Sequence, residues 1–158
     1  MSKWQFKGII AALIAAGATA TFSAQENRTL SVTATIPGAC TLTTSGAMGF
    51  GELDMSSTGN ETKQVTVTYK CATGLTVASF TVGGSNTGTY AGVMAGLTPG
   101  NTDTIPYSLT WTPPAAYAGQ GFAVTGQQVT LTGTVLNGNY ISKAPDSYAH
   151  SVVLSINY

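Results

Sequence analysis

The chain has 158 residues, which is enough for one domain with a sizeable core. Only 8% of the residues are charged and the formal net charge is zero, so the sequence lacks the basic surface that a nucleic-acid partner requires. Glycine is abundant, with 19 residues, and apolar residues alternate with threonine in many segments. This composition is typical of an all-β domain with many turns, and it argues against helical and βαβ folds.

The first residues have the pattern of a secretory signal. Lys3 and Lys7 precede an apolar run over residues 8–18, which is too short to span a bilayer. The sequence Ala-Thr-Ala at positions 18–20 has the small-x-small form of a signal-peptidase site. We therefore expect export and cleavage after Ala20; an uncleaved anchor is the alternative.

Residues 29–36 alternate strictly between apolar and hydroxyl side chains. The apolar side carries Leu30, Val32, Ala34 and Ile36. A period of two predicts a β-strand with one buried face. Pro37 and Gly38 separate this segment from the rest of the chain, so it has no hairpin partner nearby in sequence. Such a strand must join a sheet elsewhere, in its own molecule or in another one.

Further strands are predicted along the chain from the same alternation. They cover residues 40–43, 48–54, 64–71, 75–82, 105–111, 128–135 and 151–158. Residues 90–99 are rich in glycine and show no pattern, so we predict an irregular segment there. No segment after the signal has a helical period.

The two cysteines, Cys40 and Cys71, predict a disulfide, because an even pair in an exported protein usually forms one. Cys71 shares a strand face with Val65, Val67 and Tyr69, where a core disulfide belongs. Closing this loop would stabilise the fold by roughly 3–4 kcal/mol. A metal site is the weaker alternative, since two cysteines and one histidine need carboxylates to complete a tetrahedral set.

Alternating strands at this spacing predict an immunoglobulin-like β-sandwich. The last residue of the sequence still belongs to a strongly apolar strand, whose inward face would carry Val152, Leu154, Ile156 and Tyr158. We therefore expect a sandwich that is one strand short, with a groove lined by this face. The strand at residues 29–36 has the chemistry to fill such a groove.

Catalytic and metal-binding interpretations are weaker than structural ones. His150 is the single histidine, with Asp146 and Ser151 near it in sequence, but nothing indicates the oriented, water-excluding arrangement of a Ser-His-Asp triad. Glu52 and Asp54 could form a paired-carboxylate or Ca²⁺ site, although a solvated strand end explains them more simply. We therefore predict no enzyme and no cofactor.

Two further patterns also favour a structural interpretation. Tyr107 and Trp111 could bind a sugar, but they share an apolar stripe with Leu109, which favours core packing. The Gly-Gln-Gly sequence at positions 119–121 lacks the strand-to-helix context of a phosphate-binding loop.

Several motifs resemble those of the spore coat protein U family, which includes pilus subunits of the archaic chaperone–usher systems of Gram-negative bacteria. The matching segments are residues 32–40, Phe-Gly-Glu-Leu at 50–53, and residues 65–71, 105–109 and 147–158. The cysteine spacing and the C-terminal Y-x-x-x-V-x-x-x-I-x-Y pattern, which begins at Tyr148, are the most specific parts. The family usually has glycine before that tyrosine and aspartate two residues after it; here those places hold Ser147 and His150.

The resemblance implies an incomplete immunoglobulin-like domain that is completed by a strand from another molecule. In this family a periplasmic chaperone lends the strand first. At an outer-membrane usher, the N-terminal extension of the next subunit then replaces it. The implied layout is a signal peptide at residues 1–20, a donor-strand extension at 21–37 and a pilin-like domain at 38–158.

The implied partners are related pilus subunits, a periplasmic chaperone and an outer-membrane usher, without nucleic acid. The product would be an open polymer, carried through the periplasm to the cell surface. The donor side chains would be Leu30, Val32, Ala34 and Ile36. The alternative is a self-contained, adhesin- or lectin-like secreted domain, with residues 29–36 folded into its own groove.

Overall fold

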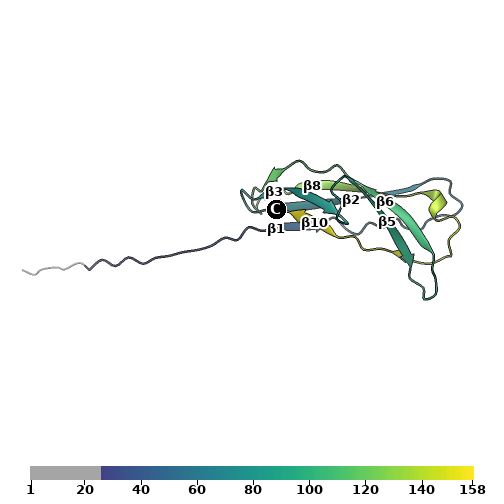
Figure 1. Ribbon diagram of the computed structural model, residues 1–158, viewed down its shortest axis with the longest axis horizontal. Helices are drawn as coiled ribbons and strands as arrows, with labels where there is room; N and C mark the ends of the chain where they lie inside the picture. Colours follow the sequence, from purple (N-terminus) through teal and green to yellow (C-terminus); the bar gives the residue numbers. More distant parts are fainter. Residues whose placement is uncertain (1–25) are drawn as a thin grey trace, which may run out of the picture. The chain divides into compact units, whose positions relative to one another are not determined.

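The computed structural model describes residues 26–158 (Figure 1). The expected signal peptide at residues 1–20 lies outside the described residues. The chain divides into two units, Met1–Thr35 and Ile36–Tyr158. Residues 26–35 contain no strand or helix. The predicted strand at residues 29–36 therefore stays a prediction about an assembled state.

The second unit is built from strands, with a single 3₁₀ turn, η1, at Asn137–Asn139. The strands are β1 (Cys40–Thr44), β2 (Glu61–Cys71), β3 (Thr76–Val77), β4 (Ser79–Val82), β5 (Thr89–Gly96), β6 (Thr104–Thr110), β7 (Tyr117–Ala118), β8 (Gln127–Val135), β9 (Tyr148–Ala149) and β10 (Leu154–Asn157). No α-helix occurs among residues 26–158. The predicted all-β fold class is confirmed.

The strands form one large sheet and two small ones. The large sheet has six antiparallel strands in the order β1-β2-β8-β6-β5-β9, and the small sheets are the pairs β4–β10 and β3–β7. Side chains from the large sheet and from β3 and β4 belong to one buried cluster. The small sheets therefore form the second layer of a β-sandwich.

The core follows from the period of two along each strand. In β2, alternate residues from Val65 to Cys71 are buried, as the sequence predicts. Tyr107, Leu109 and Trp111 are also buried, and the rings of Phe80 and Trp111 meet edge to face with centroids 6.4 Å apart. Tyr107 and Trp111 are thus core residues, which removes the sugar-binding interpretation.

The disulfide between Cys40 and Cys71 is confirmed. The two residues face each other in the antiparallel register of β1 and β2. Cys71 is fully buried and Cys40 partly so. The bond therefore joins the first strand of the domain directly to the central part of the core.

The prediction of an irregular segment at residues 90–99 is wrong, because β5 lies there and pairs with β6. Its apolar pattern is weak because small residues make room for neighbours. A Cβ atom at Gly92 would lie 2.4 Å from Cζ of Tyr107, so the Tyr107 ring occupies the space that a larger side chain would need. The glycine at position 92 therefore weakens the apolar alternation of β5 and at the same time allows β5 to pack against Tyr107.

The predicted strand at residues 48–54 is also absent, although its apolar side chains do face the core. Met48, Phe50 and Leu53 are partly buried against the core cluster. Gly133 in β8 accommodates two of them, since a Cβ atom there would lie 2.3 Å from Sδ of Met48 and 3.0 Å from Cζ of Phe50. The alternation identified the inward side chains, but the segment pairs with no strand in the described part of the chain.

Candidate functional site

One edge of β10 has no strand partner within residues 26–158. On its other edge, the carbonyl oxygens of Val153 and Asn157 each accept a hydrogen bond of 2.8 Å, from the amides of Gly83 and Ala78, which flank β4. Alternate residues of an antiparallel strand direct their backbone groups to the same side. The N–H and C=O groups of Leu154 and Ile156 therefore point to the open edge.

β1 has an open edge of the same kind, because it is the terminal strand of the six-stranded sheet. The carbonyl oxygen of Ala39 and the amide of Ser45 each form a 2.9 Å hydrogen bond on the β2 side. The alternation then directs the backbone groups of Cys40, Leu42 and Thr44 away from β2.

The two open edges approach each other from the two layers of the sandwich. Some Cα atoms of β1 and β10 lie within 8 Å of each other. Val152, Leu154 and Ile156, three of the four residues of the predicted acceptor face, are partly buried against the core. Tyr158 differs, because 60% of its surface is exposed. The structure therefore brings together an apolar strand face and two rows of unpaired backbone groups.

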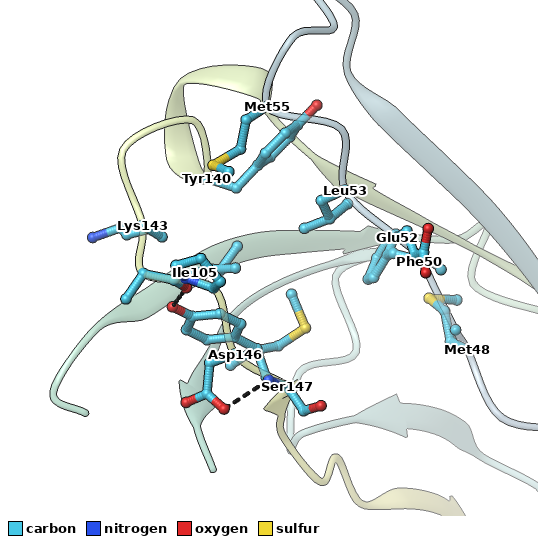
Figure 2. A pocket seen from close by; sticks show the side chains of 16 residues that line it. Met48, Phe50, Glu52, Leu53, Met55, Ile105, Tyr140, Lys143, Asp146 and Ser147 are labelled. Carbon is cyan, nitrogen blue, oxygen red and sulfur yellow. Dashed lines mark hydrogen bonds between the residues drawn. The ribbon is translucent and has the colours of Figure 1, made fainter. Parts of the chain in front are cut away.

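A cavity of about 610 Å³ lies near the segment that leads toward β10 (Figure 2). Residues 48–53 and Met55 form one wall, Tyr140 and residues 143–148 form the other, and Met94 and Ile105 also line it. In Figure 2, Phe50 and Leu53 lie across from Tyr140 and Ile105. Most of these residues were not predicted as a site. Their only sequence signal was the apolar pattern at residues 48–54, which does not show what lies opposite.

The rim of the cavity is fixed by Asp146. Its carboxylate accepts hydrogen bonds from Asn101 Nδ2 at 2.6 Å, from Thr98 Oγ1 at 2.8 Å and from the backbone amides of Thr98 and Ser147. The bonds from Asn101 and then Thr98 lower the pKa of Asp146 to about 2. Lys143 and Asp103 form an ion pair at 3.8 Å on the same side. Asp146 is thus a structural anchor for the turn at residues 98–101.

The residues considered for catalysis are not assembled into a triad. Nδ1 of His150 lies 2.8 Å from the hydroxyl oxygen of Tyr107, whereas the Asp146 carboxylate is bound to the turn at residues 98–101. Asp54 accepts hydrogen bonds from the side chain and amide of Ser56, which lower its pKa. Within residues 26–158, no group of three or more His, Cys, Asp or Glu side chains could hold a metal ion.

The predicted donor side chains are exposed in the single chain. The exposed fraction is 85% for Leu30, 83% for Val32 and 89% for Ile36. A row of exposed large apolar side chains is characteristic of an interaction site. Among the described residues, no helix is long and apolar enough to cross a membrane.

Comparison with known proteins gives one family. The model of the Spore Coat Protein U domain matches residues 26–154, which is most of the chain. No curated protein and no solved structure matches the chain. The matched region includes both the exposed segment at residues 29–36 and the start of β10.

Proposed function

The chain belongs to the Spore Coat Protein U family of surface structural proteins, and from this premise we propose that it is a fibre subunit assembled by donor-strand exchange. In this proposal residues 1–20 are the signal peptide, residues 21–37 form the donor extension and residues 38–158 form the acceptor domain. The extension of one copy adds a strand to the domain of the next copy. A periplasmic chaperone and an outer-membrane usher serve the assembly, and the product is an open fibre on the cell surface.

The observation that carries this proposal is the pair of open edges on β1 and β10. Unpaired edge strands readily accept another strand, and main-chain hydrogen bonds then supply affinity. The apolar side chains of Leu154 and Ile156 are only partly buried in the single domain. The same chain carries an exposed segment with the matching alternation at residues 29–36.

The donor strand would run antiparallel to β10, as β4 does on the other edge of that strand. It would pair with the free backbone groups of Leu154 and Ile156 on one side and of Leu42 on the other. Adjacent strands lie about 4.8 Å apart, so β1 and β10 must be about 9.6 Å apart to hold a strand between them. Because some of their Cα atoms lie within 8 Å, the two edges have to separate on assembly.

The proposal is tested by placing a charge on one face or the other of the donor segment. Val32→Asp puts a carboxylate on the apolar side, and Ser31→Asp puts the same group on the hydroxyl side as a matched control. Burying a valine contributes about 1.5–3 kcal/mol, and burying an unpaired carboxylate costs several kcal/mol. We expect Val32→Asp to block fibre growth in the presence of chaperone, and Ser31→Asp to permit it.

Thermal melting of the isolated variants separates this function from the alternative. If the donor segment acts in a neighbouring copy, Val32→Asp leaves the melting temperature of the single domain unchanged. A lowered melting temperature would show that residues 29–36 complete their own domain. The adhesin- or lectin-like module would then be the correct function.

A further inference from the structure

A second hollow lies at the end of the domain where the donor segment is attached. Its volume is about 550 Å³, and residues 36–38, 72–75 and 121–122 line it. None of these residues is charged, and Thr73 is the one with a polar side chain. Phe122 stands at its rim with 46% of its surface exposed. We call this surface the exit face.

The exit face is held rigidly by the core. The Cys40–Cys71 disulfide lies next to it in the chain, and the amide of Gly121 donates a hydrogen bond of 3.0 Å to the carbonyl oxygen of Cys71. The amide of Gly74 donates a hydrogen bond of 2.8 Å to the carbonyl oxygen of Gly119. A Cβ atom at Gly38 would lie 3.3 Å from Leu75, so the chain passes close to the domain here. This shape is therefore already formed before any partner arrives.

The loop after β5, which holds Leu97, and the loop after η1, which holds Ile141, lie at the other end of the second unit (Figure 1). The exposed fraction is 53% for Met55, 61% for Leu97 and 46% for Ile141. Figure 1 shows η1 and the β5–β6 turn far from the C-terminus, which lies near β3 and β1. We call this surface the far end.

We propose that the exit face of one copy docks on the far end of the neighbouring copy whose domain holds its donor strand. The inference rests on the proposed function, because it uses the antiparallel direction of the donor along β10. In an antiparallel pair, the last residue of the donor lies beside the start of the acceptor's β10. Ile36 of the donor copy is therefore distant from Tyr158 of the acceptor copy and close to the acceptor's far end. Ile36 is both the last donor residue and part of the exit face, so the exit face must follow it there.

This contact would join two different surfaces of identical chains. Such a heterologous contact forms a closed ring only if the rotation between successive copies returns to the first copy. Otherwise it produces an open filament. The donor strand would supply the attachment, and the contact of the exit face with the far end would set the angle between successive subunits. An uncharged hollow with an aromatic rim suits apolar side chains such as Leu97.

Hydroxyl-radical footprinting tests the contact on the unaltered chain. Wild-type fibres are compared with subunits saturated by a synthetic peptide of residues 26–37, which occupies the acceptor site but lacks residues 72–75 and 121–122 of the exit face. We expect less oxidation of Phe122 and Leu97 in the fibre than in the peptide-bound subunit. Val124 is 37% exposed on the loop of Phe122, and Val93 is 47% exposed on β5. Neither belongs to the two surfaces, so their oxidation should be unchanged.

Equal oxidation of Phe122 and Leu97 in the fibre and in the peptide-bound subunit would overturn the contact while leaving donor-strand exchange intact. Equal protection of all four residues would also overturn it, because the protection would then be unspecific. A chain that neither binds the peptide nor forms fibres would overturn the proposed function itself. In the supporting case, Phe122→Ser fibres should bend more easily than Val124→Ser fibres in electron micrographs, with unchanged peptide affinity.

Discussion

The hydroxyl oxygen of Tyr107 lies 2.8 Å from Nδ1 of His150 and links the buried face of β6 to the segment that leads into β10. The two rings also meet nearly edge to face, with centroids 5.9 Å apart. Burial, and next the neighbouring Tyr90, raise the pKa of the Tyr107 hydroxyl, so the hydroxyl stays protonated at neutral pH. This contact holds His150, and with it the segment that leads into β10, against β6.

A double-mutant cycle measures this link. Tyr107→Phe and His150→Ala each remove one partner, and the coupling between them should be about 0.5–1.5 kcal/mol in urea unfolding, which is typical of a neutral hydrogen bond. Strict additivity of the two single effects would show that the pair contributes nothing to stability.

Removing the disulfide should destabilise the domain strongly. Cys40 and Cys71 are 31 residues apart, so their bond restricts the unfolded chain by roughly 3–4 kcal/mol. The double variant Cys40→Ala, Cys71→Ala should unfold at much lower denaturant concentration than the oxidised wild type. Reduced wild type serves as the control. If the oxidised and reduced wild type unfold at the same denaturant concentration, the account of the disulfide fails.

Acid should release the turn that Asp146 holds. Its pKa falls from 3.8 in the unfolded chain to about 2 in the folded domain, so its contribution is fully present above about pH 4. That contribution is lost as the pH falls through 3.8 toward 2. Asp146→Asn should therefore melt below wild type at pH 6, and the difference should shrink at pH 2. A difference that is independent of pH would contradict the assignment.

Gly133 should not tolerate a side chain. A Cβ atom there collides with Met48 and Phe50, and overpacking of this kind costs about 1–3 kcal/mol. Gly133→Ala should lower the melting temperature, whereas Gly138→Ala should not, since nothing lies within 4 Å of a Cβ atom at Gly138. A neutral Gly133→Ala would mean that residues 48–53 are free to shift.

Alternation predicted those parts of the fold that depend on which side chains face inward. It located β2, β6 and β8 and placed Cys71 in the core. It failed at β5, where the Tyr107 ring occupies the space beside Gly92 that a larger side chain would fill. It also failed at residues 48–54, which carry apolar side chains but pair with no strand in the described part of the chain. In both places the outcome depends on a partner that is distant in sequence.

The candidate site was predictable only in part, for a related reason. Leu154 and Ile156 follow from the alternation at the C-terminus, but the direction of their backbone groups depends on the register with β4. The cavity depends on how the loops at residues 48–55 and 140–148 meet, and no local pattern encodes that meeting.

Donor-strand exchange is tested most directly by amide hydrogen exchange, followed residue by residue in the isolated subunit with and without a peptide of residues 26–37. In the isolated subunit, the amides of Leu154 and Ile156 face the open edge and should exchange quickly, while that of Ser155 is protected by β4. We expect the peptide to slow exchange at the amides of Leu154 and Ile156 and to leave that of Ser155 unchanged, and we expect a Val32→Asp peptide to have no effect. Amides of Leu154 and Ile156 that are already protected without the peptide, or that remain fast with it, would contradict the account.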